Sequence, residues 1–320
     1  MRGAGTERGT RTLRVATVSP EIVLGDVAGN IERIRIALRT AAAKGASLIV
    51  LPELATSGYV FTDRDEAVRA GLTRSDRVWA GLAAEIPEGV VAVVGYAELV
   101  PTPTAAGRDD VALYNSAAVF SARERIGDYR KAHLWGRESA LFSAGETAGA
   151  VFQTELGRVG IAICYDSEFP EVPRGLALAG ADLLVLPVNW PLVHRPESEH
   201  PPELIQAMAA ARSSRIATII ADRHGEERGV SWTGGSAVID EDGWIVATSD
   251  DSGISVVTLV LRASGDKSFP PHNDLFADRR PDLYHCGPGC ALHSAAAPGM
   301  IIDSGQQGAF GEFGDASGGR

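Results

Sequence analysis

Three residues of contrasting chemistry lie in or beside apolar segments of the sequence. Glu53 ends the run LIVLPE, Lys131 lies in YRKAHLW, and Cys164 lies in VGIAICYD. A thiol, a carboxylate and an ammonium group can act together as nucleophile, general base and stabiliser of developing negative charge. Taken singly, each has an ordinary alternative: an inert core thiol, a helix or loop cap, and a surface charge. Together they predict a site for nucleophilic catalysis.

The elements that must position these residues have the character of buried strands. ASLIVLPE, VGIAICYD and ADLLVLPVNW are short, continuous apolar runs, which is typical of strands covered on both faces. Helices are predicted at 25–43, 78–85, 174–179 and 202–216, and a hairpin that turns on Asp242-Gly243 at 236–249. Helices inserted between strand pairs indicate an α/β fold with two sheets faced by helices. The ends of core strands are where such folds place active sites.

Composition narrows the class of protein. With 320 residues, of which 45% are hydrophobic, the chain can form one sizeable core. Its net charge is −11 and no basic stretch stands out, which argues against a nucleic-acid partner. We expect no membrane association, because no apolar run reaches the roughly 20 residues of a membrane span. The N-terminus lacks the apolar region of a signal peptide, and the chain has three cysteines, so we expect a cytoplasmic location.

The composition changes near both ends of the chain. We predict a disordered N-terminal segment at 1–12, one enzyme domain at 13–285 and a tail at 286–320. The tail is rich in Gly, Ala and Ser and shows no helix or strand period, so we expect it to be mostly disordered. Cys286 and Cys290 fall in this tail, where the neighbouring histidines give only a weak case for a metal site. No metal is therefore predicted.

The order of the motifs resembles that of the nitrilase superfamily of carbon–nitrogen hydrolases. The matching stretches are LIVLPELATSGY, YRKAHLWGRESALFSAGE and VGIAICYDSEFPEVPRGLALAGADLLVLPVNW, and the similarity runs from about Leu13 to Tyr284. The resemblance implies an α-β-β-α sandwich that pairs into an αββα-αββα dimer, so a homodimer or larger homo-oligomer is expected. CYDSEFPE looks like the aliphatic amidase and ω-amidase-like branch, and the Trp-Glu common after the cysteine of true nitrilases is absent.

The resemblance also implies roles for individual residues. Cys164 would attack a carbonyl carbon, Glu53 would take the thiol proton, and Lys131 would stabilise the oxyanion together with the backbone N–H of Tyr165. Glu138 matches a second glutamate of the family, which would hold Lys131 protonated. A thioester would form and then be hydrolysed. This thiol chemistry requires no cofactor.

Other residues are candidates for the walls of the substrate pocket. Tyr59 follows Glu53 in the same loop, and Asn189 and Trp190 follow the end of another buried strand. The backbone of Tyr165 completes the predicted substrate contacts. Trp190 has a core or subunit contact as its alternative.

The predicted reaction is hydrolysis of a small non-peptide amide to a carboxylic acid and ammonia. The alternative is hydrolysis of an N-carbamoyl amino acid or a related ureido compound, in which Arg174 or Arg195 could bind the substrate carboxylate. A nitrilase activity ranks next. The non-enzyme alternative is a catalytically silent binding protein of the same fold, which the complete set of Glu53, Lys131 and Cys164 argues against.

Overall fold

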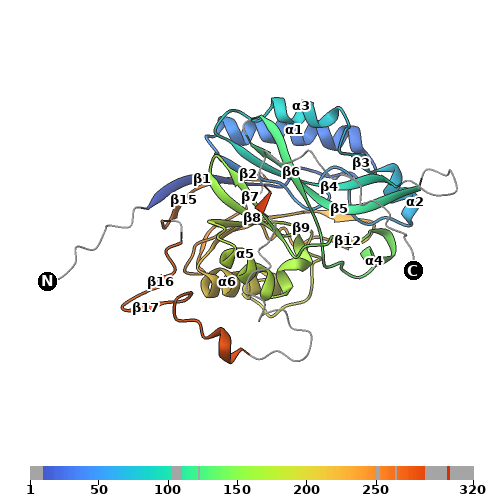
Figure 1. The fold of residues 1–320 in the computed structure, drawn as a ribbon. Helices are drawn as coiled ribbons and strands as arrows, with labels where there is room; N and C mark the ends of the chain where they lie inside the picture. Colours follow the sequence, from blue (N-terminus) through green and yellow to red (C-terminus); the bar gives the residue numbers. More distant parts are fainter. Residues whose placement is uncertain are drawn as a thin grey trace, which may run out of the picture.

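Two seven-stranded sheets lie face to face between two layers of helices (Figure 1). The structure, a computed structural model, describes residues 10–102, 110–121, 123–249, 253–263 and 265–284, together with the backbone of 301–302. Helices α1 (Val27–Ala43) and α3 (Val78–Ala84) cover the outer face of the first sheet. Helices α5 (Glu171–Leu178) and α6 (Pro202–Ser214) cover the outer face of the second. The predicted α-β-β-α order of layers is confirmed.

The first sheet contains most of the N-terminal half of the chain. Its strands run in the order β15 (Ile254–Leu261), β1 (Arg11–Val18), β2 (Leu48–Val50), β4 (Val91–Thr102), β5 (Asp110–Ser121) and β6 (Glu124–Arg130), and β3 (Leu72–Thr73) pairs with β4. Two short helices, α2 (Arg64–Arg69) and α4 (Glu138–Leu141), lie in the connections. β15 returns from late in the chain and pairs antiparallel with β1 along all eight residues of each strand.

The second sheet carries the segment that contains the cysteine. Its strands run in the order β14 (Ile245–Thr248), β13 (Ala237–Ile239), β10 (Ala217–Asp222), β9 (Leu183–Val188), β8 (Gly157–Ile161), β7 (Ala150–Thr154) and β18 (Ile301–Ile302). The remaining elements are the ribbons β11 (Glu226–Glu227) with β12 (Val230–Ser231) and β16 (Ser268–Phe269) with β17 (Asn273–Asp274), and the 3-10 turns η1 (Cys164–Glu168) and η2 (Pro281–Leu283). No helix in the described ranges is long and apolar enough to cross a membrane.

The continuous apolar runs arise because both faces of the central strands are covered. In β2, Leu48 and Val50 belong to the core between the two sheets, whereas Ile49 packs in the layer under α1 and α3. Alternate residues of a strand point to opposite faces, so a strand covered on both sides needs an apolar residue at every position. Val93 and Val94 of β4 divide between the same two clusters.

Paired residues also occur near both ends of the chain, in the segments where disorder is predicted. β1 begins at Arg11, two residues before the predicted start of the domain, because Arg11 and Thr12 continue the pairing with β15. Within the tail predicted to be disordered, Ile301–Ile302 pair in parallel with β7. Residues 1–9, 285–300 and 303–320, with Cys286 and Cys290 among them, lie outside the described residues.

The turn that carries Glu53 is packed directly against β4. A Cβ atom on Gly95 would lie 2.2 Å from the carbonyl oxygen of Pro52 and 2.7 Å from Cα of Glu53. The backbone N–H of Thr56 also donates to the carbonyl oxygen of Gly95 at 3.3 Å. Glycine is therefore needed here for the close approach of two backbone segments.

Gly95→Ala is expected to lower the free energy of unfolding by about 2 kcal/mol, because the added methyl group must displace the Glu53 turn. The matched control is Gly81→Ala in α3, where an added Cβ has nothing within 4 Å. This control is expected to keep the stability or raise it by up to about 1 kcal/mol, since alanine favours helix over glycine. Urea titrations compare the three proteins. Equal unfolding free energies for Gly95→Ala and the wild type would contradict the close approach.

Candidate active site

Glu53 lies in a fully buried turn after β2, with one carboxylate oxygen paired and the other open. Its Oε1 accepts hydrogen bonds from Nζ of Lys131 at 2.7 Å and from Nδ2 of Asn115 at 2.7 Å. Its Oε2 is buried and has no hydrogen-bond partner among the described residues. Burial raises the pKa of Glu53 to about 7, although Lys131 and Asn115 oppose that shift. This carboxylate can therefore take up and release a proton near neutral pH.

Lys131 is completely buried between two carboxylates. It follows directly after β6, and its Nζ lies 2.7 Å from Oε1 of Glu53 and 2.8 Å from Oε1 of Glu138. Burial lowers the pKa of Lys131, but the charges of Glu53 and Glu138 more than offset this, and the net pKa is raised. Lys131 is thus a fixed ammonium group, and it does not act as a proton donor at neutral pH.

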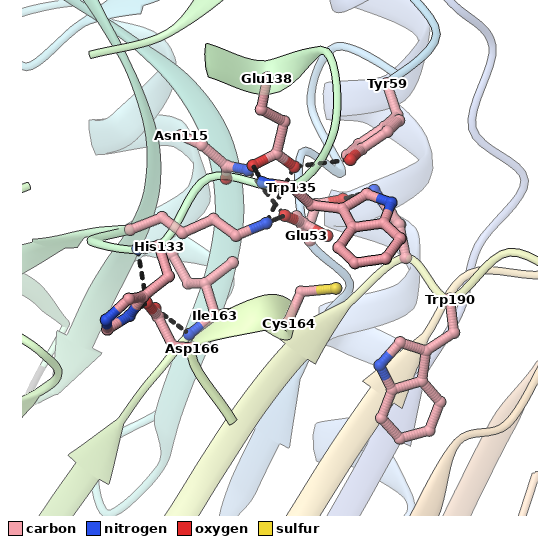
Figure 2. A network of polar contacts seen from close by, with 12 residues as sticks. Glu53, Tyr59, Asn115, His133, Trp135, Glu138, Ile163, Cys164, Asp166 and Trp190 are labelled. Carbon is pink, nitrogen blue, oxygen red and sulfur yellow. Dashed lines mark hydrogen bonds and ion pairs between the residues drawn. The ribbon is translucent and has the colours of Figure 1, made fainter. Parts of the chain in front are cut away.

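Glu138, the first residue of α4, is held by donors on both oxygens. Besides Lys131, Oε1 accepts a hydrogen bond from the hydroxyl of Tyr59 at 2.6 Å, and Oε2 accepts one from the backbone N–H of Trp135 at 3.0 Å (Figure 2). The carboxylate is nearly inaccessible to solvent. The structure thus brings Glu138 to Lys131, as the resemblance implied.

Cys164 lies in a strained turn rather than in a strand. β8 ends at Ile161, and Cys164 begins η1 with a φ of 45°, a left-handed conformation that is uncommon outside glycine. The predicted strand through 159–166 was therefore too long. Leu54, the residue after Glu53, also has a positive φ of 49°. Such strain persists only where the surroundings fix the backbone, and it is concentrated at functional sites.

Asp166 is the side chain that fixes the cysteine turn. Its carboxylate accepts hydrogen bonds from the backbone N–H of Ile163 at 3.0 Å, the backbone N–H of His133 at 2.9 Å and the hydroxyl of Tyr129 at 2.7 Å. Nδ1 of His133 lies a further 2.8 Å from the same carboxylate. Asp166 thereby joins the turn after β8 to the segment that carries Lys131, across the two sheets.

The thiol of Cys164 faces the buried carboxylate. In Figure 2 the sulfur points toward the side on which Glu53 and Trp135 lie, while His133 points away from it. Burial, followed by the charge of Glu53, raises the pKa of the Cys164 thiol well above its usual value, and Lys131 and the backbone N–H of Asn189 act in the opposite direction. The resting group is a thiol, so its proton must pass to a base as the sulfur attacks.

The other predicted residues differ in how closely they approach this cluster. Tyr59 contacts Glu138 directly, and Nδ2 of Asn189 donates to the carbonyl oxygen of Glu53 at 2.9 Å. Tyr165 is the second residue of η1, and its ring packs edge-on against Trp135 with 4.9 Å between centroids. Trp190 is 2% exposed, belongs to the largest apolar cluster, and points away from the charged groups in Figure 2. Contact of Trp190 with a substrate stays a prediction.

Sequence reasoning missed three residues that the structure adds to the site. Asn115 donates to Glu53, Asp166 fixes the cysteine turn, and Trp135 packs against Tyr165. Trp135 and Asp166 lie inside stretches that carry the resemblance, whereas Asn115 lies outside them. A polar side chain at the start of the apolar run NSAAVFS was an available signal for Asn115. Among the described residues, no group of three or more His, Cys, Asp or Glu side chains could hold a metal ion.

Asp166→Asn is expected to lower the free energy of unfolding by about 3 kcal/mol. The amide nitrogen of the asparagine would face a backbone N–H group that donates a hydrogen bond to the carboxylate in the wild type, so two donors would meet. The control is Asp282→Asn, which removes an exposed ion pair with Arg280 and should leave the stability unchanged. Thermal unfolding of both variants measures the difference. Equal stability of the two would show that Asp166 does not fix the turn.

Proteins of one family are similar to this chain in sequence. The model of the carbon-nitrogen hydrolase family matches residues 14–265. A nitrilase of Pyrococcus abyssi is 32% identical over 273 residues, which cover 83% of this chain and 96% of the relative. An N-carbamoylputrescine amidase of Arabidopsis thaliana is 32% identical over 281 residues, which cover 81% of this chain and 90% of the relative.

Solved structures agree with the sequence relatives. The crystal structure of an amidase from Nesterenkonia sp. is similar with a TM-score of 0.62 and 26% identity, covering 85% of this chain and 94% of the amidase. In another structure of that amidase, the acetamide moiety of fluoroacetamide is covalently added at the active-site cysteine. The family model covers well over half of the chain. The chain therefore belongs to the carbon–nitrogen hydrolase family of the nitrilase superfamily, and it is an enzyme that acts on non-peptide carbon–nitrogen bonds.

Proposed function

We propose that the enzyme hydrolyses a small non-peptide amide to a carboxylic acid and ammonia through a thioester on Cys164. The observation that carries this proposal is the open oxygen of Glu53. Oε2 is buried without a partner in the described part of the chain, on a carboxylate whose pKa is raised to about 7, beside a thiol that must lose its proton. A base with these properties suits proton transfer from sulfur to a leaving nitrogen.

The reaction follows from the positions of the groups. The sulfur of Cys164 attacks the carbonyl carbon as its proton passes to Glu53. The carbonyl oxygen becomes an oxyanion, which the ammonium of Lys131 and the backbone N–H of Tyr165 stabilise. Collapse breaks the carbon–nitrogen bond, and Glu53 returns the proton to the departing ammonia.

Hydrolysis of the thioester completes the cycle. Glu53, again a carboxylate, takes a proton from a water molecule that attacks the thioester carbon. The carboxylic acid leaves, and the proton on Glu53 returns to the sulfur of Cys164. Lys131 keeps its charge throughout, because its ion pair with Glu138 persists while Glu53 carries the proton.

Hydrolysis of an N-carbamoyl compound is the second candidate, because the same groups can act on a ureido carbonyl. Of the two arginines considered for a substrate carboxylate, Arg174 donates to the carbonyl oxygens of Ser213 and Leu275 and stacks on Phe276, so it is already engaged. Nη1 of Arg195 is buried without a hydrogen-bond partner among the described residues, which favours Arg195 for that role. A homo-oligomeric state and a cytoplasmic location stay predictions.

The first test measures ammonia release from short aliphatic amides, ω-amides of dicarboxylates, N-carbamoyl amino acids and nitriles. We expect release from an amide group by the wild type and none by Cys164→Ala, because the nucleophile is lost. A variant that lacks the two tail thiols, Cys286→Ala/Cys290→Ala, is the control and should match the wild type. Ammonia release by Cys164→Ala would sink the mechanism, and release from carbamoyl compounds alone would favour the second candidate.

The pH dependence of kcat/KM tests the role of Glu53. Glu53 can accept the thiol proton only as a carboxylate, and burial raises its pKa to about 7. Activity on an uncharged amide should therefore be full above this pKa and fall about tenfold per unit as the pH decreases below it. A profile that stays flat between about pH 5 and pH 8 would exclude a base with this pKa.

A further inference from the structure

A buried ion pair outside the catalytic residues holds the loop that follows Glu53. Arg223, just after β10, pairs with Glu227 of β11, and the two side chains are 3% and 4% exposed. Oε1 of Glu227 accepts hydrogen bonds from the backbone N–H groups of both Tyr59 and Val60. Arg223 follows a strand of the second sheet and Glu227 lies in the ribbon β11–β12, whereas the loop follows β2 of the first sheet. One carboxylate therefore joins the two halves of the domain beside the active site.

The loop lies in close contact with this carboxylate. A Cβ on Gly58 would lie 2.8 Å from Oε2 of Glu227 and 2.8 Å from Cα of Leu24, and Gly58 has a φ of 82°. Glycine satisfies both the close contact and the left-handed backbone. The backbone of residues 58–60 is thus shaped around Glu227. This arrangement leaves little freedom for the direction in which Tyr59 points.

Tyr59 is consequently fixed at both of its ends. Its N–H is bound to Glu227 at 2.9 Å, and its hydroxyl donates to Glu138 at 2.6 Å (Figure 2). The ring packs edge-on against Trp232, with 5.4 Å between centroids. The guanidinium of Arg223 lies over the same Trp232 ring, 5.3 Å from its centre. The ion pair thus supports Tyr59 through the backbone and through the aromatic ring.

We propose that Glu227, held by Arg223, is a positioning residue that aims the Tyr59 hydroxyl at Glu138 and so keeps Glu138 directed at Lys131. The proposal rests on the proposed function, because Lys131 is the group that stabilises the oxyanion. Glu227 itself touches none of the reacting groups. It acts through a chain of contacts from Glu227 to Tyr59, from Tyr59 to Glu138 and from Glu138 to Lys131.

A double-mutant cycle tests this chain of contacts. Glu227→Gln keeps the shape of the side chain but removes its charge and sets an amide N–H against Arg223. Tyr59→Phe removes only the hydroxyl that reaches Glu138. We expect each single variant to lower kcat about tenfold with KM changed by less than about threefold. The double variant should be about as slow as either single variant, since both changes break the same chain.

The control is Glu241→Gln, which breaks a largely buried ion pair with Arg262, 3.2 Å apart, beyond the opposite end of β10. This variant should keep kcat within about twofold of the wild type. Equal reductions of kcat by Glu227→Gln in the wild-type and Tyr59→Phe backgrounds would overturn the proposal. So would a folded Glu227→Gln with wild-type kcat. If Glu227→Gln fails to fold, Glu227→Asp replaces it in the same cycle, with the same criteria. This variant keeps the charge but moves the carboxylate away from the backbone N–H groups of Tyr59 and Val60.

A second measurement separates this proposal from the proposed function. The same variants are treated with iodoacetamide, an amide that alkylates thiols, and the rate at Cys164 is followed by peptide mass spectrometry. Slower alkylation in Glu227→Gln but no further slowing in the double variant supports the positioning role even without turnover. If the wild type releases no ammonia, only the proposed function is contradicted. If the wild type is active, all variants are alkylated at the same rate and the effects on kcat are additive, only the proposed role of Glu227 is contradicted.

Discussion

One ammonium group held between two carboxylates inside the protein is the interaction on which the rest of the site depends. Removing three charged groups from water is costly unless each finds partners of good geometry. Asn115 supplies a donor to Glu53, while the hydroxyl of Tyr59 and the backbone of Trp135 supply donors to Glu138. One carboxylate oxygen, Oε2 of Glu53, has no partner among the residues that the structure describes. The cluster is therefore stable enough to be buried and yet has an acceptor available for chemistry.

The nucleophile is arranged by the opposite strategy, with conformational strain in place of charge pairing. Cys164 adopts a positive φ, and Asp166 holds the turn by binding the backbone on both sides of the sheet interface. The raised pKa of the thiol means that the sulfur is not ionised in advance. Sulfur and base act as a pair: the sulfur keeps its proton at rest, and the carboxylate, whose pKa is raised to about 7, takes that proton when a carbonyl carbon is in reach.

The sequence predicts the parts of this architecture that depend on local composition. Continuous apolar runs identify strands covered on both faces, and a charged residue directly after such a run identifies a buried polar position, as with Glu53. The contributions of Asn115, Asp166 and Glu227 depend on contacts between residues 62, 37 and 168 positions apart, and no local pattern reports those. The end of β8 was misplaced for a related reason, since Asp166 draws the N–H of Ile163 away from the strand pattern.

The pairing of β15 with β1 has a consequence for how the protein is made. β1 ends at Val18, but its antiparallel neighbour begins only at Ile254, so β1 is synthesised long before the strand that pairs with it. Until β15 has been synthesised, one edge of β1 offers unpaired backbone groups along an eight-residue strand. Open strand edges readily pair with other chains. The nascent enzyme thus passes through a long interval in which this edge of β1 is open to aggregation, and the pairing of β15 with β1 ends that interval.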